Sequence, residues 1–148
     1  RFGDWTTFVK HDDRGKTCFV DTTAKRSSST PASFKRDGDV RIVVSQRPSN
    51  RTKKEIYVFV GYDWGPQGTA SLQAANEQFA LSRGDLEDSG SAVWLDDTNE
   101  EGRLIDLMRR SSEVVVSSTF THGRKSVDMF SLRGFASAIA RADAECAW

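Results

Sequence analysis

The amino-acid sequence predicts a mainly β protein: an antiparallel β-sandwich with one short internal helix and a C-terminal helix. About eight short runs of β-branched and aromatic residues recur along the chain, with polar turns between them. A helical pattern interrupts these runs once, near Leu104, and a second helical pattern follows Gly134. Many short strands at close spacing favour a sandwich, and a partly closed barrel is the alternative architecture.

The composition narrows the classes of function. The chain has 148 residues, so we expect residues 1–148 to form a single domain. Hydrophobic residues make up 37% of the chain, which is typical of a globular protein. Lys plus Arg and Asp plus Glu both number 21, so there is no uniform basic field for nucleic acid. No apolar run approaches the roughly 20 residues of a membrane span.

The two cysteines, Cys18 and Cys146, lie near opposite ends of the chain. We expect them to form a disulfide bond, and two buried free thiols are the alternative. A disulfide would suit an oxidising compartment such as a periplasm. The chain begins with Arg1 and not with methionine, so we also expect that a signal peptide or another upstream segment has been removed.

The first third of the chain predicts one hairpin and one long connection. Residues 4–10 form a strand with bulky Trp5 and Phe8, residues 11–16 a polar turn, and residues 17–20 the returning strand. Residues 22–39 are rich in Ser, Thr and Lys, and they predict a long, mobile surface connection.

The middle of the chain contains the strongest strand patterns. Residues 40–44 and 56–60 are β-branched and aromatic, and the near-continuous apolar character of 56–60 predicts a central strand buried on both faces. The remaining predictions are a basic turn at 47–54, a glycine-rich loop at 61–68, a hairpin of 70–74 with 78–81, an acidic loop at 84–91 and a strand at Ala92–Leu95.

The last third predicts two helices and a hairpin. Thr98 and Glu101 fit a capping box at the start of a short helix that carries Leu104 on its apolar face. Residues 114–116 and 127–132 form a hairpin. The final helix has an apolar face at spacings of three and four, made of Phe135, Ala138, Ile139, Ala142 and Cys146.

Several short motifs follow one another in a characteristic order along essentially the whole chain. They are Gly3-Asp4-Trp5, Cys18-Phe19-Val20, Val43 with Ser45, Arg47 and Pro48, Gly61-Tyr62, Phe79 with Leu81, Ala92 with Trp94 and Leu95, Met108-Arg109, and the run from Asp128 to Ala138. In this order they resemble the invasion-associated locus B (IalB) family. The resemblance implies a secreted or periplasmic bacterial domain with an immunoglobulin-like β-sandwich and paired terminal cysteines. Some members of the family are associated with host-cell invasion.

Catalytic chemistry has weak support in the sequence. His11 lies beside Asp12 and Asp13 in a predicted turn, and His122 lies beside Gly123 in another, so either histidine is best explained by a solvated turn. A hydrolase that uses His122 or His11 is the opposing hypothesis, but no Gly-x-Ser-x-Gly motif accompanies them. Cys18 is expected to be structural and not a nucleophile. We therefore assign no catalytic residue.

Three other groups are candidates for binding. The acidic stretch Asp96, Asp97, Asn99, Glu100 and Glu101 lacks the spacing of a calcium loop, and carboxylates at a helix start are expected from its dipole. The basic run Arg47, Arg51, Lys53 and Lys54 is best explained as a solvated turn. Tyr62 and Trp64, in a glycine-rich loop, are possible partner-binding residues, although they can also fold over the end of the sandwich. Trp5 and Trp94 are expected in the core.

These observations predict a non-enzymatic domain that binds a protein or a cell-envelope component. It is expected to be periplasmic or secreted, to contact no nucleic acid, and to need no cofactor or metal. A structural envelope protein without a specific ligand is a further alternative. An exposed apolar patch would favour the binding module.

Overall fold

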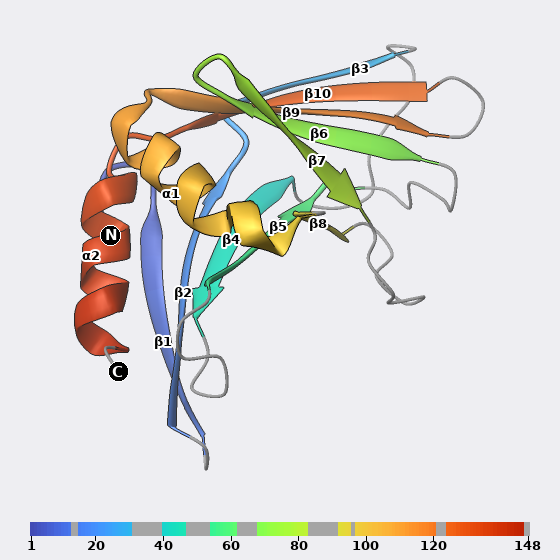
Figure 1. Ribbon diagram of the computed structural model, residues 1–148. Helices are drawn as coiled ribbons and strands as arrows, with labels where there is room; N and C mark the ends of the chain where they lie inside the picture. The colour runs from blue at the N-terminus through green and yellow to red at the C-terminus, as the bar shows by residue number, and fades with distance from the viewer. Residues whose placement is uncertain are drawn as a thin grey trace.

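The structure is a computed structural model, and it describes residues 1–12, 15–30, 40–46, 54–61, 68–82, 92–95, 97–120 and 124–146 (Figure 1). The elements in chain order are β1 (Thr6–Asp12), β2 (Gly15–Thr23), β3 (Arg26–Thr30), β4 (Arg41–Gln46), β5 (Lys54–Phe59), β6 (Thr69–Ala74), β7 (Glu77–Ser82), β8 (Ala92–Leu95), a 3-10 turn (Thr98–Glu100), α1 (Glu101–Arg110), β9 (Glu113–Phe120), β10 (Arg124–Ser131) and α2 (Phe135–Glu145).

The ten strands of the described residues belong to one antiparallel sheet with the order β1-β2-β4-β5-β8-β7-β6-β9-β10-β3. Figure 1 shows that the sheet bends, so that β1, β2 and β4 run steeply while β6, β9, β10 and β3 cross above them. Helix α1 lies inside this bend and contacts β5 and β6, and α2 packs along β1 and β2. The prediction of an antiparallel, mainly β protein with one internal and one C-terminal helix is confirmed.

The core fills the space between the curled sheet and the two helices. Strand positions alternate between this interior and the outer surface, as in β6, where Ala70, Leu72 and Ala74 are buried. The predicted apolar face of α2 is confirmed, because Phe135, Ala138, Ile139, Ala142 and Cys146 are all buried. Helix α1 buries Leu104, Ile105 and Met108.

The two ends of the chain meet in a group of residues that we call the terminal clamp: Trp5, Cys18, Gly134, Phe135 and Cys146. Cys18 in β2 and Cys146 after α2 form a disulfide bond across 128 residues of sequence. The Trp5 indole packs edge to face on Phe135, with ring centroids 4.8 Å apart, and donates its N–H to the Ser131 carbonyl at 2.9 Å. The expected disulfide and the expected burial of Trp5 are both confirmed.

Gly134 makes this close approach of the ends possible. Its φ of +90° lies in the region that favours glycine. A Cβ at this position would lie 1.9 Å from the backbone oxygen of Phe2, so any side chain would push the N-terminal segment away. The N-cap of α2 is therefore a glycine, the residue type that permits both the turn and the close contact with Phe2.

The predicted surface connection at residues 22–39 is wrong for its first part. Strand β2 continues to Thr23, and Arg26–Thr30 forms the edge strand β3, which pairs with β10. This segment has no apolar periodicity, so its strand conformation comes from pairing with β10 and not from its own pattern. Residues 31–39 lie outside the described part of the chain.

Four smaller predictions also need correction. The α1 helix begins after a 3-10 turn, so its N-cap is Glu100 and not Thr98, and Glu100 makes no side-chain cap hydrogen bond. His11 belongs to strand β1 and not to a turn. Strand β5 alternates in burial, whereas β4 is the strand buried at nearly every position. Trp94, expected in the core, is only half-buried.

No helix in the described ranges is long and apolar enough to cross a membrane.

Candidate functional site

The cysteines have a structural role. Both sulfur atoms belong to the Cys18–Cys146 disulfide, and the chain has no free cysteine. A disulfide sulfur is not the thiolate that nucleophilic catalysis requires. The bond instead ties the end of α2 to the second strand of the sheet.

Of the two histidines, the structure describes His11. His11 is exposed in β1, where its backbone lies opposite Lys16 in β2. His122 lies outside the described residues, as do Tyr62 and Trp64. The roles expected for these three side chains therefore stay predictions.

The acidic stretch supports the start of α1. The Asp97 carboxylate accepts a hydrogen bond from the Asn99 amide at 3.0 Å, and Glu100 pairs with Arg103 at 2.6 Å. Arg103 also pairs with Glu77 and lies over the Phe79 ring. Among the described residues no group of three or more His, Cys, Asp or Glu side chains is placed to hold a metal ion. Asp96 lies outside the described part.

Of the basic run, only Lys54 is described. Its ammonium group pairs with Asp143 of α2 at 3.1 Å, and Arg109 of α1 reaches the same carboxylate at 3.6 Å. The described member of this run therefore joins the sheet to the two helices. Arg47, Arg51 and Lys53 are outside the described ranges.

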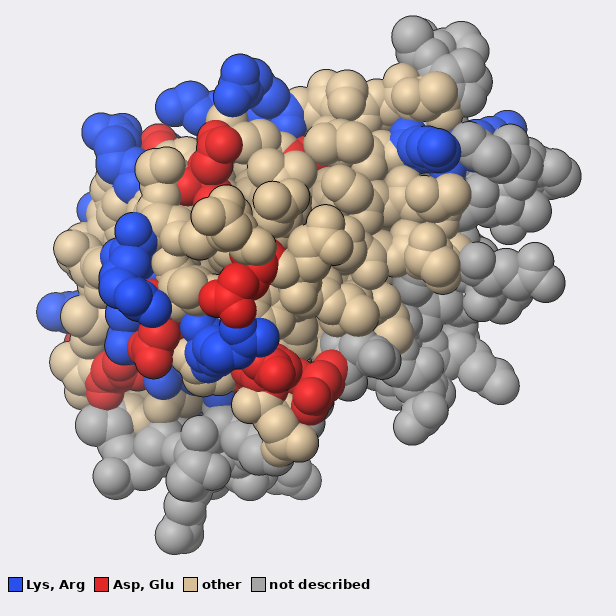
Figure 2. Space-filling model, turned by 45° about the horizontal axis from the view of Figure 1, so that its top comes forward, with Lys and Arg blue, Asp and Glu red and all other residues tan. Residues whose placement is uncertain are grey.

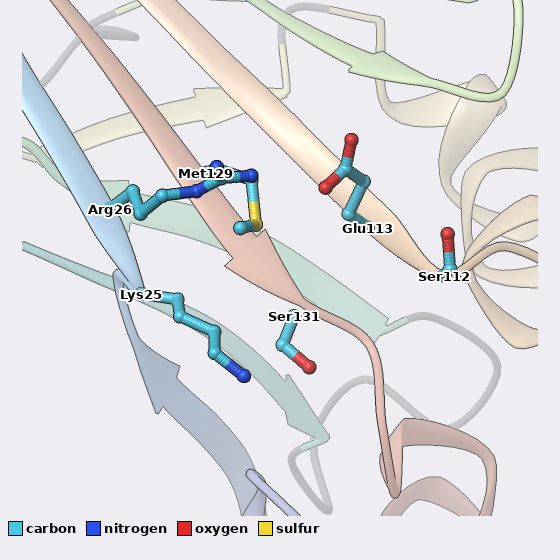
Figure 3. A pocket seen from close by; sticks show the side chains of 6 residues that line it. All are labelled: Lys25, Arg26, Ser112, Glu113, Met129 and Ser131. Carbon is cyan, nitrogen blue, oxygen red and sulfur yellow. The ribbon is translucent and has the colours of Figure 1, made fainter.

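A pocket of about 520 Å³ lies on the outer surface where β3, β10 and β9 run side by side (Figure 3). We call it the β3–β9 pocket. It is lined by Lys25, Arg26, Ser112, Glu113, Met129 and Ser131. Figure 3 shows two cationic side chains coming from the β3 side and Glu113 standing on β9, with Met129 between them.

The strand register places these side chains. Arg26 is the cross-strand partner of Met129, and Glu113 is the partner of Ser131. Met129 and Ser131 are two residues apart on β10, so they share one face of the sheet. The Lys25 amide donates to the Met129 carbonyl at 2.8 Å, which fixes the start of β3 against β10. The pocket therefore has a rigid floor of hydrogen-bonded strands.

One end of the pocket is joined to the N-terminus through Asp4. The Ser131 hydroxyl donates to the Asp4 carboxylate at 2.6 Å, and the Arg133 guanidinium donates to it at 3.3 Å. These hydrogen bonds hold the pKa of Asp4 below its usual value, with smaller help from the nearby charges of Arg133 and Lys25. The Ser131 hydroxyl is therefore already committed as a donor.

The three charged groups of the pocket differ from most other charged side chains in the described part of the chain. Across the described ranges, Lys25, Arg26 and Glu113 take part in no ion pair and no side-chain hydrogen bond. Elsewhere, as in the group of Lys54, Arg109 and Asp143, opposite charges pair directly. The pocket is a place where unpaired charges of both signs face a common space.

Figure 2 shows how charge is distributed over this side of the molecule. Lys, Arg, Asp and Glu gather toward the side on which the helices lie, and a broad area without charge extends over the strands beside them. Val127 of β10, which is 44% exposed, is among the large apolar side chains that reach the surface.

A second group that the sequence did not predict is aromatic. Tyr57 of β5 lies 5.6 Å from Phe59 and 6.1 Å from Trp94 of β8, and all three are half-buried. Arg41 lies over the Phe59 ring and pairs with Asp21 at 3.4 Å. Burial raises the pKa of Asp21, and the Arg41 charge opposes that rise. On this face Val43, the cross-strand partner of Tyr57, is only 3% exposed.

Comparison with known proteins gives a likeness of fold. No protein-family model and no curated protein sequence matches the chain. Among solved structures, the crystal structure of invasion associated protein b from Bartonella henselae matches with a TM-score of 0.69. The match covers 97% of this chain and 93% of that one, at 15% sequence identity. The resemblance seen in the sequence motifs is thus confirmed at the level of the fold.

Proposed function

We propose that this protein is a non-enzymatic, secreted or periplasmic bacterial domain of the invasion-associated locus B kind, and that it binds a protein or a cell-envelope component. The observation that carries the proposal is the likeness to invasion associated protein b over almost the full length of both chains. A match of this extent aligns the architecture as a whole and not one motif. On this proposal residues 1–148 are one domain with an immunoglobulin-like arrangement.

The location outside the cytoplasm is supported by the disulfide. Cys18 and Cys146 are the chain's two cysteines, and they are bonded across 128 residues of sequence. Such bonds persist in oxidising spaces and are rare in the reducing cytosol. A bond that secures the terminal helix would be of little use where it is kept reduced.

A binding role is supported by the surface chemistry. The β3–β9 pocket presents unpaired charges over a thioether floor, which is suited to recognition. Both cysteines are committed to the disulfide, and His11 is exposed on a regular strand. On this proposal Tyr62 and Trp64 are additional contact residues, and a role in host-cell interaction is part of the proposal, supported only by the words "invasion associated" in the name of the similar protein.

The proposal is tested in the source bacterium with the natural gene carrying an affinity tag at its 3′ end. Cells are fractionated after their free thiols are blocked in acid. We expect the protein in the periplasm or the medium, with neither cysteine alkylated. A cytoplasmic protein with both thiols alkylated would refute the location and reopen Cys18 as a reactive group.

Binding is tested on the same cells with a photo-crosslinking amino acid at Tyr62, Trp64 or Val127. We expect one defined crosslinked species from at least one of these positions, and none from a matched label at Gly102 on α1. The hydrolase alternative is tested with the His11→Ala and His122→Ala variants. If a hydrolytic activity of the purified protein disappears in either variant, the non-enzymatic proposal fails.

A further inference from the structure

The β3–β9 pocket carries opposite charges on opposite walls. Lys25 and Arg26 stand at the β3 side, and Glu113 stands on β9, two strands away. Although all three line one pocket, neither cation pairs with the carboxylate, and the described chain supplies no other ion-pair partner for any of them. The two walls therefore leave a gap with a positive side and a negative side.

The width of this gap follows from the sheet. Neighbouring strands are about 4.8 Å apart, so the backbones of β3 and β9, with β10 between them, are about 10 Å apart. The side chains of Arg26 and Glu113 extend into this distance and shorten it. A ligand that contacts both walls therefore needs two opposite charges closer together than the backbones, which a dipeptide, or a tripeptide that is not fully extended, provides at up to about 3.5 Å per residue.

We propose that the β3–β9 pocket binds a short zwitterionic peptide with free ends, holding its carboxylate between Lys25 and Arg26 and its ammonium group at Glu113. This inference rests on the proposed binding function and deepens it by naming the ligand class. The guanidinium of Arg26 is suited to a carboxylate, because its fork of N–H donors matches the two oxygens. Glu113 accepts the N–H groups of an ammonium in the same way.

The remaining lining residues fit a small peptide. Met129 is half-buried in the floor, and its flexible thioether accommodates aliphatic side chains of varied shape. The Ser112 hydroxyl is exposed at the Glu113 end, where the Ser112 carbonyl also accepts the Leu132 amide at 3.0 Å. A volume of about 520 Å³ lies within the range of small-molecule sites.

Each simpler ligand leaves one wall unused. A plain anion would be attracted by Lys25 and Arg26 but repelled by Glu113, and a plain cation would meet the reverse. Only a ligand with both charges gains from both walls. Neutralising Glu113 should therefore lower the affinity for a zwitterion and raise the affinity for an anion.

The test uses the oxidised full chain labelled with ¹⁵N and titrated by NMR with three probes. They are trialanine with free ends, N-acetyl-trialanine, which keeps only the carboxylate, and trialanine amide, which keeps only the ammonium group. We expect amide chemical-shift changes in and around β3, β10 and β9. Free trialanine should bind about threefold more tightly, or better, than either blocked form, as expected for exposed ion pairs. Equal affinity of the three probes, or no shift in these strands, would overturn the proposal.

Variants assign the charges to the walls. Arg26→Gln and Lys25→Gln should each lower the affinity for free trialanine and for N-acetyl-trialanine by about threefold. Glu113→Gln should lower the affinity for free trialanine and raise the affinity for N-acetyl-trialanine. Lys125→Gln on β10 and Asp106→Asn on α1 remove one charge of each sign outside the pocket, and they should change neither affinity. If Glu113→Gln leaves the preference for free over acetylated peptide intact, the assignment of the negative wall is wrong.

Failure here is distinguishable from failure of the proposed function. The thermal transition of the Lys25, Arg26 and Glu113 variants should match that of the parent, since these three side chains are exposed and form no ion pair or side-chain hydrogen bond within the described ranges. If the protein is exported and oxidised but binds no peptide, only the ligand class is refuted. If it is cytoplasmic and reduced, the proposed function fails whatever the pocket binds.

Discussion

The terminal clamp and the β3–β9 pocket are neighbours, yet they are built in opposite ways. In the clamp, Trp5 is fully buried, packs on Phe135 and donates to Ser131, and a disulfide closes the same region. In the pocket, Lys25 and Glu113 are exposed and unpaired across the described chain. Buried, hydrogen-bonded contacts stabilise a fold, whereas exposed, hydrated charges remain free to pair with a ligand at a modest gain in free energy. The comparison suggests that the clamp secures the strands on which the pocket is displayed.

The largest effect is expected from the disulfide. Replacing Cys18 and Cys146 together by Ser should lower the free energy of unfolding by roughly 4–5 kcal/mol, because the bond closes a loop of more than 100 residues. Urea denaturation of the oxidised parent and the double variant measures this difference. Where the variant is still folded, its peptide titration should be unchanged. A loss of under about 1 kcal/mol would show that the clamp does not depend on the bond.

The aromatic contact in the clamp is expected to be nearly as important. Trp5→Ala removes a fully buried ring and the hydrogen bond to Ser131, and should cost about 3–5 kcal/mol of unfolding free energy. Phe8→Ala is the matched control, since Phe8 is also aromatic and near in the chain but 50% exposed. Its cost should be within about 0.5 kcal/mol. Similar losses for both variants would contradict the distinction between the buried and the exposed ring.

Two glycines should respond to alanine with opposite signs. Gly134→Ala should destabilise by about 2 kcal/mol or more, because the positive φ is strained for alanine and the new Cβ meets the Phe2 carbonyl. Gly102→Ala on α1 meets nothing within 4 Å and should stabilise by about 0.5–1 kcal/mol through helix propensity. Thermal denaturation of both variants measures these effects. A neutral Gly134→Ala would show that the ends do not need their close approach.

The smallest effect is the pH dependence of the link between clamp and pocket. The pKa of Asp4 is lowered in the folded state by Ser131 and Arg133, so its ionised form contributes stability above the unfolded pKa of about 3.9. That contribution is lost as the pH falls through the lower folded-state pKa. Asp4→Asn should therefore be less stable than the parent at pH 6, and the difference should shrink toward pH 3. A difference that is constant with pH would exclude the carboxylate as its source.

Local patterns predicted much of the fold. The C-terminal helix follows from the spacing of Phe135, Ala138 and Ile139, and strand β8 from four apolar residues at Ala92–Leu95. The hairpin of β6 and β7 follows from two alternating runs around a turn at Ala75, whose φ is +55°. Each of these signals lies within a few residues of its consequence, so no long-range contact was needed to find it.

The pocket had no such signal. Strand β3 is a stretch of Arg, Ser and Thr that resembles a loop, and only its pairing with β10 makes it a strand. Without β3, Lys25 and Arg26 have no reason to face Glu113. In the same way Trp94, apolar and within a strand, was expected in the core, although its strand position turns it toward Tyr57 on the half-buried face. The face of a short strand depends on its partners in the sheet.

The sequence by itself determined the class of fold, the two helices, the disulfide expectation and the resemblance that the structural likeness supports. Those features depend on periodicity and on residue order, which are present in the linear chain. The tertiary structure alone decided that the ten strands form one curled sheet, that β3 completes its edge, and that unpaired charges of both signs share a pocket. Pairing between distant strands is a property of register and packing, and the energy that selects it appears only when the strands meet.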